Sequence, residues 1–448
     1  MSTIETMNKA IKIISTTRKF NLSASGEAAA AFRFLDDAIQ DPKSELRDAC
    51  WTAAYKYLAG SEGPEAALQY FEARAHRCSW RARLLVWQAH SIATDNADAF
   101  LAALEQEQDE PENGGFIDLL RAKTELRQGA VISAKQRLDT VEAQHCRSNY
   151  GAELLRLQAL LGSWPAIEKA LKSRDFMTRM PKGEPRKLRK RLRWARAGRN
   201  SIGFPCRHKI ISLERAQRRR RGLTERYGLL GLDVAFQAAV DGQHLPNELY
   251  EDWCPTGLHH RAGVSNGLSQ MAVLTEFLAS GDRHRLILED DAWPFADMAF
   301  ARSLLTDHVP KDFDILYVGV RATRDWFRRS DTVVTRYGEA LKAVRGRFVA
   351  SGLEGYIVSR QGAEKLLANF DKDRILGAID FQVAYYSLTD QEHASLQQEC
   401  FDGAFGRFRK NIANYVPLES YALHRPLVTP SFLGDSTIVA TNMDVRSG

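Results

Sequence analysis

The chain of 448 residues lacks any run of about 18 apolar residues, the length that a membrane-spanning helix needs. We therefore expect no membrane span. Residues 1–19 carry Glu5 early and have no long apolar centre, so they do not resemble a secretory signal. We expect a cytoplasmic protein, with peripheral contact to the inner face of a membrane left open by the charge pattern described below.

Cysteine is sparse and scattered. None of the six cysteines forms a CxxC pair, which argues against a disulfide framework and favours free thiols in a reducing compartment. His76 with Cys78, and His145 with Cys146, lack a second ligand pair nearby. We expect neither pair to bind a metal ion.

Positive charge is concentrated in one stretch. Residues 181–199 contain nine Lys or Arg and one acid, Glu184, within a chain of net charge +6. Such a stretch attracts the phosphates of anionic lipid or nucleic acid, but its lone aromatic, Trp194, argues against single-stranded nucleic acid. Two interpretations stay open: a solvated basic linker or helix within residues 179–206, or a contact with a membrane surface or an anionic acceptor.

Residues 1–178 show the pattern of consecutive helices. Helices are predicted at 26–40, 50–58, 64–74, 81–92, 96–105, 116–127, 131–143, 150–161 and 165–171. A small or apolar residue recurs at about the 34-residue period of tetratricopeptide repeats, at Ala31, Ala67, Ala99, Ala134 and Ile167. The resemblance is degenerate, because most hairpins lack the full signature. The stacked hairpins either hold a partner on a concave surface or pack on the rest of the chain.

Strand and helix patterns alternate in residues 207–448. Strands are predicted at 208–213 and 234–240, with a charged helix at 215–227 between them. This alternation favours an α/β sheet.

An acidic triplet follows a buried strand in this half. Leu286, Ile287 and Leu288 precede Glu289-Asp290-Asp291. Ligands of open α/β sheets lie beyond the carboxyl ends of strands, and adjacent carboxylates need a cation, hydrogen bonds or water. A hard divalent ion would suit these oxygen ligands, and a solvated acidic turn is the alternative. On a strand, Glu289 and Asp291 would share a face, provided that the strand continues past Leu288.

Further segments flank the triplet in a recognisable order. They are Ser212-Leu213 with Arg219, Ala239-Val240-Asp241-Gly242, 265–270, 312–319, 351–367, 378–383 and a closing loop with Pro426 and Asp435-Ser436. Their order over about residues 207–438 resembles glycosyltransferase family 25. This family includes bacterial lipopolysaccharide galactosyl- and glucosyltransferases and collagen galactosyltransferases.

The resemblance implies a fold and an activity. The fold would be an α/β transferase domain of the GT-A type, a mixed sheet flanked by helices, after the helical repeat domain. The activity would be transfer of galactose or glucose from a UDP-sugar to a glycan, lipid-linked or protein acceptor, with inversion and with Mn²⁺ or Mg²⁺. The expected setting is lipopolysaccharide or other cell-surface polysaccharide biosynthesis.

The resemblance also implies site residues. The predicted metal ligands are Glu289, Asp291 and His424. The predicted donor contacts are Ser212, Leu213, Arg219, Ser269, Gln270, Asp290, Gly352 and Tyr356. Asp380 is the predicted base, because an inverting transfer must remove the acceptor's hydroxyl proton. Three alternatives stay open: His424 as a surface or core histidine, Asp380 as a helix N-cap or an acceptor contact, and Tyr356 as a core residue.

Two departures from the family pattern motivate a second hypothesis. Ser265-Asn266 replace Gly-Cys, and Gln270 replaces a His. Glutamine can hydrogen-bond but cannot change its charge near neutral pH. The second hypothesis is a catalytically inactive, transferase-like scaffold that binds a partner through its helical repeats. A nucleic-acid-binding protein, based on residues 181–199, is the third.

Overall fold

The computed structural model describes residues 3–19, 26–40, 48–107, 115–142, 148–180, 183–198, 203–257, 259–294, 304–319, 334–342, 353–396, 402–412, 414–423 and 426–430. By its internal contacts the chain divides into two compact units, Met1–Pro111 and Glu112–Gly448. The sequence predicted domain boundaries at residues 178 and 207 from composition and motifs, whereas this division follows contacts between residues. The predicted boundaries therefore stay predictions.

The first unit is helical. Its elements are α1 (Thr3–Lys19), α2 (Gly26–Gln40), α3 (Asp48–Ser61), α4 (Pro64–Glu72), the 3-10 turn η1 (Ala75–Arg77), α5 (Trp80–Ala93) and α6 (Ala97–Gln106). Pro64 occupies the first turn of α4, where its missing N–H is no loss. Ser79 caps α5 by accepting a hydrogen bond from the backbone N–H of Ala82.

The predicted repeat positions are buried in four of five hairpins. Ala31, Ala67, Ala134 and Ile167 are buried, but Ala99 is exposed. Ala99 lies early in α6, as the repeat pattern places it, but the buried face of this helix carries Ala97, Phe100 and Leu104.

The second unit opens with six helices, α7 (Phe116–Arg127), α8 (Val131–Thr140), α9 (Ser148–Leu161), α10 (Trp164–Lys172), α11 (Arg174–Arg179) and α12 (Glu184–Gly198). The last of these lies within the stretch expected to be a basic linker or helix. Leu188 and Leu192 of α12 are buried, while Arg186, Arg189, Arg193 and Arg196 are exposed. Spacings of three and four residues place these arginines along one face of the helix.

A mixed seven-stranded sheet follows, in the order β2-β1-β3-β7-β5-β8-β6. The strands are β1 (His208–Ser212), β2 (Phe236–Ala238), β3 (His284–Glu289), β5 (Ile315–Tyr317), β6 (Val334–Arg336), β7 (Gly355–Ser359) and β8 (Ser420–Leu423). The strand β1 is parallel to β2 and β3, and β5 is parallel to β8, whereas β7 is antiparallel to both β3 and β5. The strands β1, β3, β5 and β8 therefore end at the same edge of the sheet.

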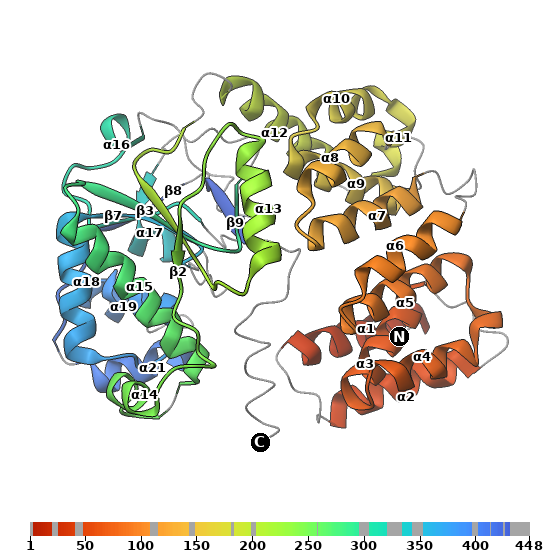
Figure 1. Cartoon of the computed structure of the whole chain (residues 1–448), viewed down its shortest axis with the longest axis horizontal. Coiled ribbons are helices and arrows are strands. Elements are labelled where there is room, and N and C mark those ends of the chain that lie inside the picture. The colour runs from red at the N-terminus through yellow and green to blue at the C-terminus, as the bar shows by residue number, and fades with distance from the viewer. Residues whose placement is uncertain are drawn as a thin grey trace. The chain divides into compact units, whose positions relative to one another are not determined.

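Both faces of the sheet are buried, and they face different cores. Leu286 and Leu288 of β3 face the core shared with α7–α12, and Ile287 faces the core shared with α15 (Arg261–Ala279) and α18 (Arg360–Asp373). This alternation follows from the two-residue period of a strand. Figure 1 shows α15 and α18 together beside the sheet, and α13 (Gln217–Gly228) near α8.

Short elements complete the unit. They are α14 (Asn247–Trp253), β4 (Ala292–Pro294), α16 (Leu304–Asp307), α17 (Tyr337–Lys342), α19 (Ile379–Tyr386), α20 (Asp390–Leu396), α21 (Asp402–Asn411) and β9 (Val428–Pro430). The strands β4 and β9 form an antiparallel pair apart from the main sheet. Within the described ranges, no helix is long and apolar enough to cross a membrane.

Candidate active site

The acidic triplet lies at the edge where the parallel strands end. Ile211 of β1 is in register with Glu289 of β3, and Leu288 is in register with Gly355, the first residue of β7. The end of β1, the end of β3 and the start of β7 therefore meet, as the sequence predicted for a site at the carboxyl ends of strands.

The strand β3 ends at Glu289, and Asp290 and Asp291 form the turn to β4. The prediction that Glu289 and Asp291 share a face of a strand therefore does not apply, because Asp291 is not part of a strand.

Asp290 is held on both of its oxygens. Arg219 donates from Nη1 to Asp290 Oδ1 at 2.7 Å, and Ser212 donates from Oγ to Asp290 Oδ2 at 3.0 Å. Arg220 reinforces this contact by donating to Ser212 Oγ at 3.2 Å and to its carbonyl oxygen at 2.8 Å. The end of β1, the start of α13 and the acidic turn are thus joined by charge-assisted hydrogen bonds.

The run of charge in residues 215–227 predicts that Arg218, Arg220 and Arg221 form the solvated face of one helix, and this prediction is wrong for Arg220. Arg218 and Arg221 are exposed, whereas Arg220 is partly buried and contacts Ser212. The helical period held the signal, because Leu223 and Tyr227, the buried positions of α13, lie on the same side as Arg219 and Arg220.

Glu289 is a carboxylate of the acidic triplet, and its pKa is raised. Its Oε1 accepts hydrogen bonds from Asn266 Nδ2 at 3.3 Å and from Gln270 Nε2 at 3.4 Å. Burial raises the pKa of Glu289 to about 8, with the charge of Asp291 as the next cause, while the hydrogen bond from Asn266 opposes the shift. The amide partners are neutral and do not cancel the charge of Glu289, unlike the guanidinium beside Asp290.

The residue that departs from the family pattern is part of this network. Tyr356 donates from its hydroxyl to Gln270 Oε1 at 2.9 Å, which fixes the side-chain amide with its N–H directed at Glu289. Tyr356 is 2% exposed and lies in the core beside α15, and burial raises its pKa. Gln270 thus joins the tyrosine of β7 to the glutamate of β3.

Two more carboxylates act on Glu289. The charges of Asp380 and Glu354 both raise its pKa. Glu354 is 0% exposed, and its carbonyl oxygen accepts from the backbone N–H of Glu289 at 3.1 Å. The sequence reasoning missed Glu354. Its position directly before Gly355 and Tyr356 was the available signal.

Asp380 is the second residue of α19, not its cap. The N-cap is Ala378, and Asp380 Oδ1 accepts from the backbone N–H of Phe381 at 2.9 Å. The alternative of Asp380 as N-cap is therefore wrong. Its carboxylate acts electrostatically on Glu289 and belongs with the acidic group.

Ser269 and Leu213 hold the turns beside the site. Ser269 Oγ accepts from the backbone N–H of Val240 at 2.8 Å and donates to the carbonyl oxygen of Ser265 at 2.7 Å. The carbonyl oxygen of Leu213 accepts from the backbone N–H of Ala216 at 3.0 Å at the start of α13. The contact with Val240 joins α15 to the segment after β2, and the contact with Leu213 forms the turn from β1 to α13.

No three His, Cys, Asp or Glu side chains in the described part of the chain are grouped so as to hold a metal ion. The predicted ligand His424 and the predicted donor contact Gly352 lie outside the described residues, as do Ser351 and Asp435-Ser436. The chemistry of the site nevertheless suits a cation, because the charge of Glu289 is opposed by Asp291, Asp380 and Glu354. The metal site stays a prediction.

A shallow surface pocket lies at the opposite edge of the sheet. It is lined by residues 280–283, 311–313 and 359–361, where β3 and β5 begin and β7 ends. None of the predicted site residues contributes to it.

Comparison with known proteins agrees with the site's position. Residues 207–382 match the family described as "Glycosyltransferase family 25 (LPS biosynthesis protein)". A curated protein of Aedes aegypti named "Glycosyltransferase 25 family member" is 28% identical over 175 residues, which is 35% of this chain and 27% of that protein. The chain thus matches about a quarter of the length of this relative. These matches support a glycosyltransferase, and no family match confirms the tetratricopeptide resemblance.

Proposed function

We propose that this chain transfers galactose or glucose from a UDP-sugar to a glycan, lipid-linked or protein acceptor, with inversion, in the synthesis of lipopolysaccharide or another surface polysaccharide. The observation that carries the proposal is the acidic turn at the end of β3, which Arg219 and Ser212 hold by Asp290. This turn lies within the matched residues 207–382.

The departing diphosphate would develop negative charge that the site must stabilise. Mn²⁺ or Mg²⁺, held by Asp291, Glu289 and His424, would supply a Lewis acid for that charge. Arg219 lies 2.7 Å from Asp290 in the acidic turn, and it would add positive charge beside the phosphates.

Asp380 would take the proton of the acceptor hydroxyl. Its charge acts on Glu289 together with that of Asp291, so the proposed base and the proposed cation site belong to one electrostatic group. Gln270 and Asn266 would keep Glu289 directed into this group.

Donor turnover tests the proposal. Purified protein is incubated with a panel of UDP-sugars and Mn²⁺, with and without chelator, and UDP release is measured. We expect slow, chelator-sensitive release from one sugar, lost in Asp291→Asn. Asp371→Asn, at an exposed aspartate of α18, is the matched control and should keep full activity. Absence of UDP release together with absence of metal-dependent UDP binding by calorimetry would overturn the proposal in favour of the scaffold hypothesis.

The acceptor side of the proposal includes an anionic membrane surface. Four exposed arginines lie along one face of α12, while Leu188 and Leu192 of the same helix are buried in the core. Such a helix would bind a lipid surface by charge without inserting. Changing Arg186, Arg189, Arg193 and Arg196 to Gln should abolish binding to anionic vesicles, whereas changing the scattered exposed residues Lys56, Arg83, Lys311 and Lys410 should not. Equal loss in both variants would refute a local surface.

A further inference from the structure

Side chains of α13 form hydrogen bonds with the acidic turn and with β4, the strand that follows it. Arg219 donates to Asp290, Tyr227 donates from its hydroxyl to the carbonyl oxygen of Ala292 at 3.2 Å, and Arg226 donates from Nη2 to the carbonyl oxygen of Pro294 at 2.9 Å. Arg219 and Arg226 are seven residues apart, about two helical turns, and therefore lie on the same face. The helix thus supports residues 290–294 at three points.

Arg226 also bonds to the helices that precede the sheet. Its Nη2 donates to the carbonyl oxygen of Leu160, in the last turn of α9, at 2.8 Å. The side chain is 0% exposed, and its guanidinium lies 5.9 Å from the centre of the Trp293 ring. Because a buried charge must be hydrogen-bonded to be tolerated, this guanidinium holds the end of α9 and the end of β4 together.

An adjacent side of α13 touches the turn between α7 and α8 with almost no space between the backbones. A Cβ atom on Gly129, whose φ is +76°, would lie 2.3 Å from the carbonyl oxygen of Arg218, and one on Gly222 would lie 3.3 Å from Gly129 Cα. The backbone N–H of Ile132 donates to Glu225 Oε2 at 2.9 Å. A movement of α8 is therefore transmitted to α13.

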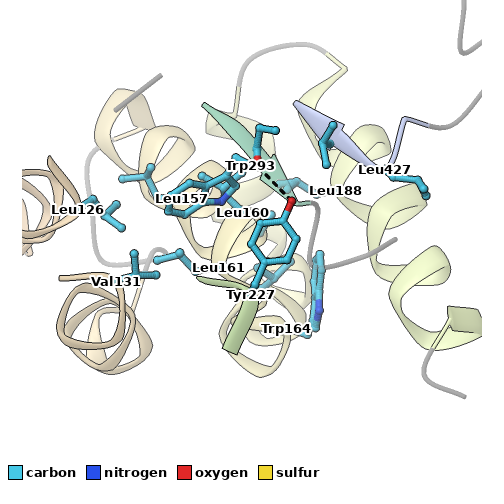
Figure 2. Packing of buried hydrophobic residues seen from close by; sticks show 14 of the residues in the cluster. Leu126, Val131, Leu157, Leu160, Leu161, Trp164, Leu188, Tyr227, Trp293 and Leu427 are labelled. Carbon is cyan, nitrogen blue, oxygen red and sulfur yellow. Dashed lines mark hydrogen bonds between the residues drawn. The ribbon is translucent and has the colours of Figure 1, made fainter. Parts of the chain in front are cut away.

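The side chains around these bonds form one apolar cluster. Figure 2 shows Leu157, Leu160 and Leu161 of α9 and Trp164 of α10 around Tyr227, with Trp293 and Leu427 in the same cluster. Interiors of this kind are packed densely and transmit strain. The helices and the strand after the acidic turn have no solvent layer between them in this cluster.

We propose that Arg226 is a positioning residue for the acidic turn, and that α7–α9 act through it and through α13 on the site. The helices from residue 115 onward are then part of the catalytic unit, although they precede the matched residues 207–382. The expected effect on kcat rests on the proposed function, but the expected effect on the mobility of the acidic turn does not.

Hydrogen–deuterium exchange of the full-length chain tests the structural consequence. We expect Arg226→Met to raise the exchange rate of the amides of residues 289–293 at least tenfold, and Arg226→Lys to restore part of the protection. Gly129→Ala should raise the same exchange rate, although Gly129 lies between α7 and α8 and does not belong to the acidic turn. Gly183→Ala is the matched control, because Gly183 also has a positive φ (+91°) but has no neighbour within 4 Å. Peptides of α18, on the other face of the sheet, report whether each variant remains folded.

The kinetic readout separates positioning from general destabilisation. We expect Arg226→Met to lower kcat about tenfold with little change in the KM for the UDP-sugar, and Arg226→Lys to recover most of kcat. Unchanged exchange of residues 289–293 in both Arg226→Met and Gly129→Ala would overturn the inference, whatever the activity. Raised exchange in a chain without any donor turnover would support the inference and count against the proposed function alone.

Discussion

Replacing Glu289 by glutamine would test the electrostatics of the site directly. Glutamine keeps an oxygen that can accept from Asn266 and Gln270 and removes only the charge. The pKa of Glu289 is raised from its ordinary value of 4.5 to about 8. The folded protein therefore binds a proton at this residue over a pH range where the unfolded chain has released it.

The sign and size of the effect follow from this difference. A carboxyl group with a raised pKa in the folded state stabilises the protein fully only below pH 4.5, and this contribution is lost as the pH rises through about 8. The full shift corresponds to about 5 kcal/mol at 1.36 kcal/mol per pH unit. Because the side chain is only partly buried, solvent screening reduces the expected effect to about 2 kcal/mol.

Urea unfolding from pH 4.5 to 8.5, without divalent ions, measures the effect. We expect Glu289→Gln to match the wild type at pH 4.5 and to be more stable by about 2 kcal/mol at pH 8. Glu364→Gln, at an exposed glutamate of α18 whose side chain is 60% exposed, is the control and should show no such trend. A difference that stays constant across this range would refute the raised pKa of Glu289 and the carboxylate repulsion inferred from it.

Three further predictions concern neighbouring contacts. Changing Arg219 to Gln removes the cation from Asp290 and should lower the free energy of unfolding by about 1–3 kcal/mol in urea titrations. The same change in an Asp290→Asn variant should lower it clearly less. An equal loss in both backgrounds would contradict the ion pair. Tyr356→Phe should lower stability by about 1 kcal/mol through loss of the bond to Gln270, and an unchanged urea midpoint would contradict that bond. Burial, followed by the charge of Arg285, lowers the pKa of His208 to about 4, so NMR should show no titration of its ring between pH 5.5 and 8, and a midpoint near 6.5 would disprove its burial.

The elements with strong local signals could be predicted from the sequence. The helix at 116–127 was predicted to the residue, and the strand at 208–213 to within one residue, because apolar periodicity and a glycine turn mark them. The position of the acidic turn followed from an aliphatic run that ends in carboxylates. The second strand is shorter than expected, Phe236–Ala238 instead of 234–240, because an apolar run does not show where backbone pairing stops.

The contacts within the charged helix α13 could not be predicted. Its sequence places four arginines in a row, and although the helical period separates Arg219 and Arg220 from the exposed Arg218 and Arg221, it does not show which atoms they contact. Arg226 bonds to carbonyl oxygens 66 and 68 residues away in the chain. Bonds to backbone atoms so distant in sequence leave no local pattern, and the same is true of the bond between Tyr356 and Gln270.

The contact between Gly129 and Gly222 bears on how this chain can be shortened. The family match begins at residue 207, which makes a cut there the natural choice for a smaller protein. Such a fragment would lack Gly129 and the apolar surface of α9 and α10, and would expose Leu223, Tyr227 and Trp293 to water. Large exposed apolar patches favour aggregation. The smallest fragment of this chain that keeps this apolar cluster covered and keeps its site is therefore expected to begin near residue 112, where the second compact unit starts.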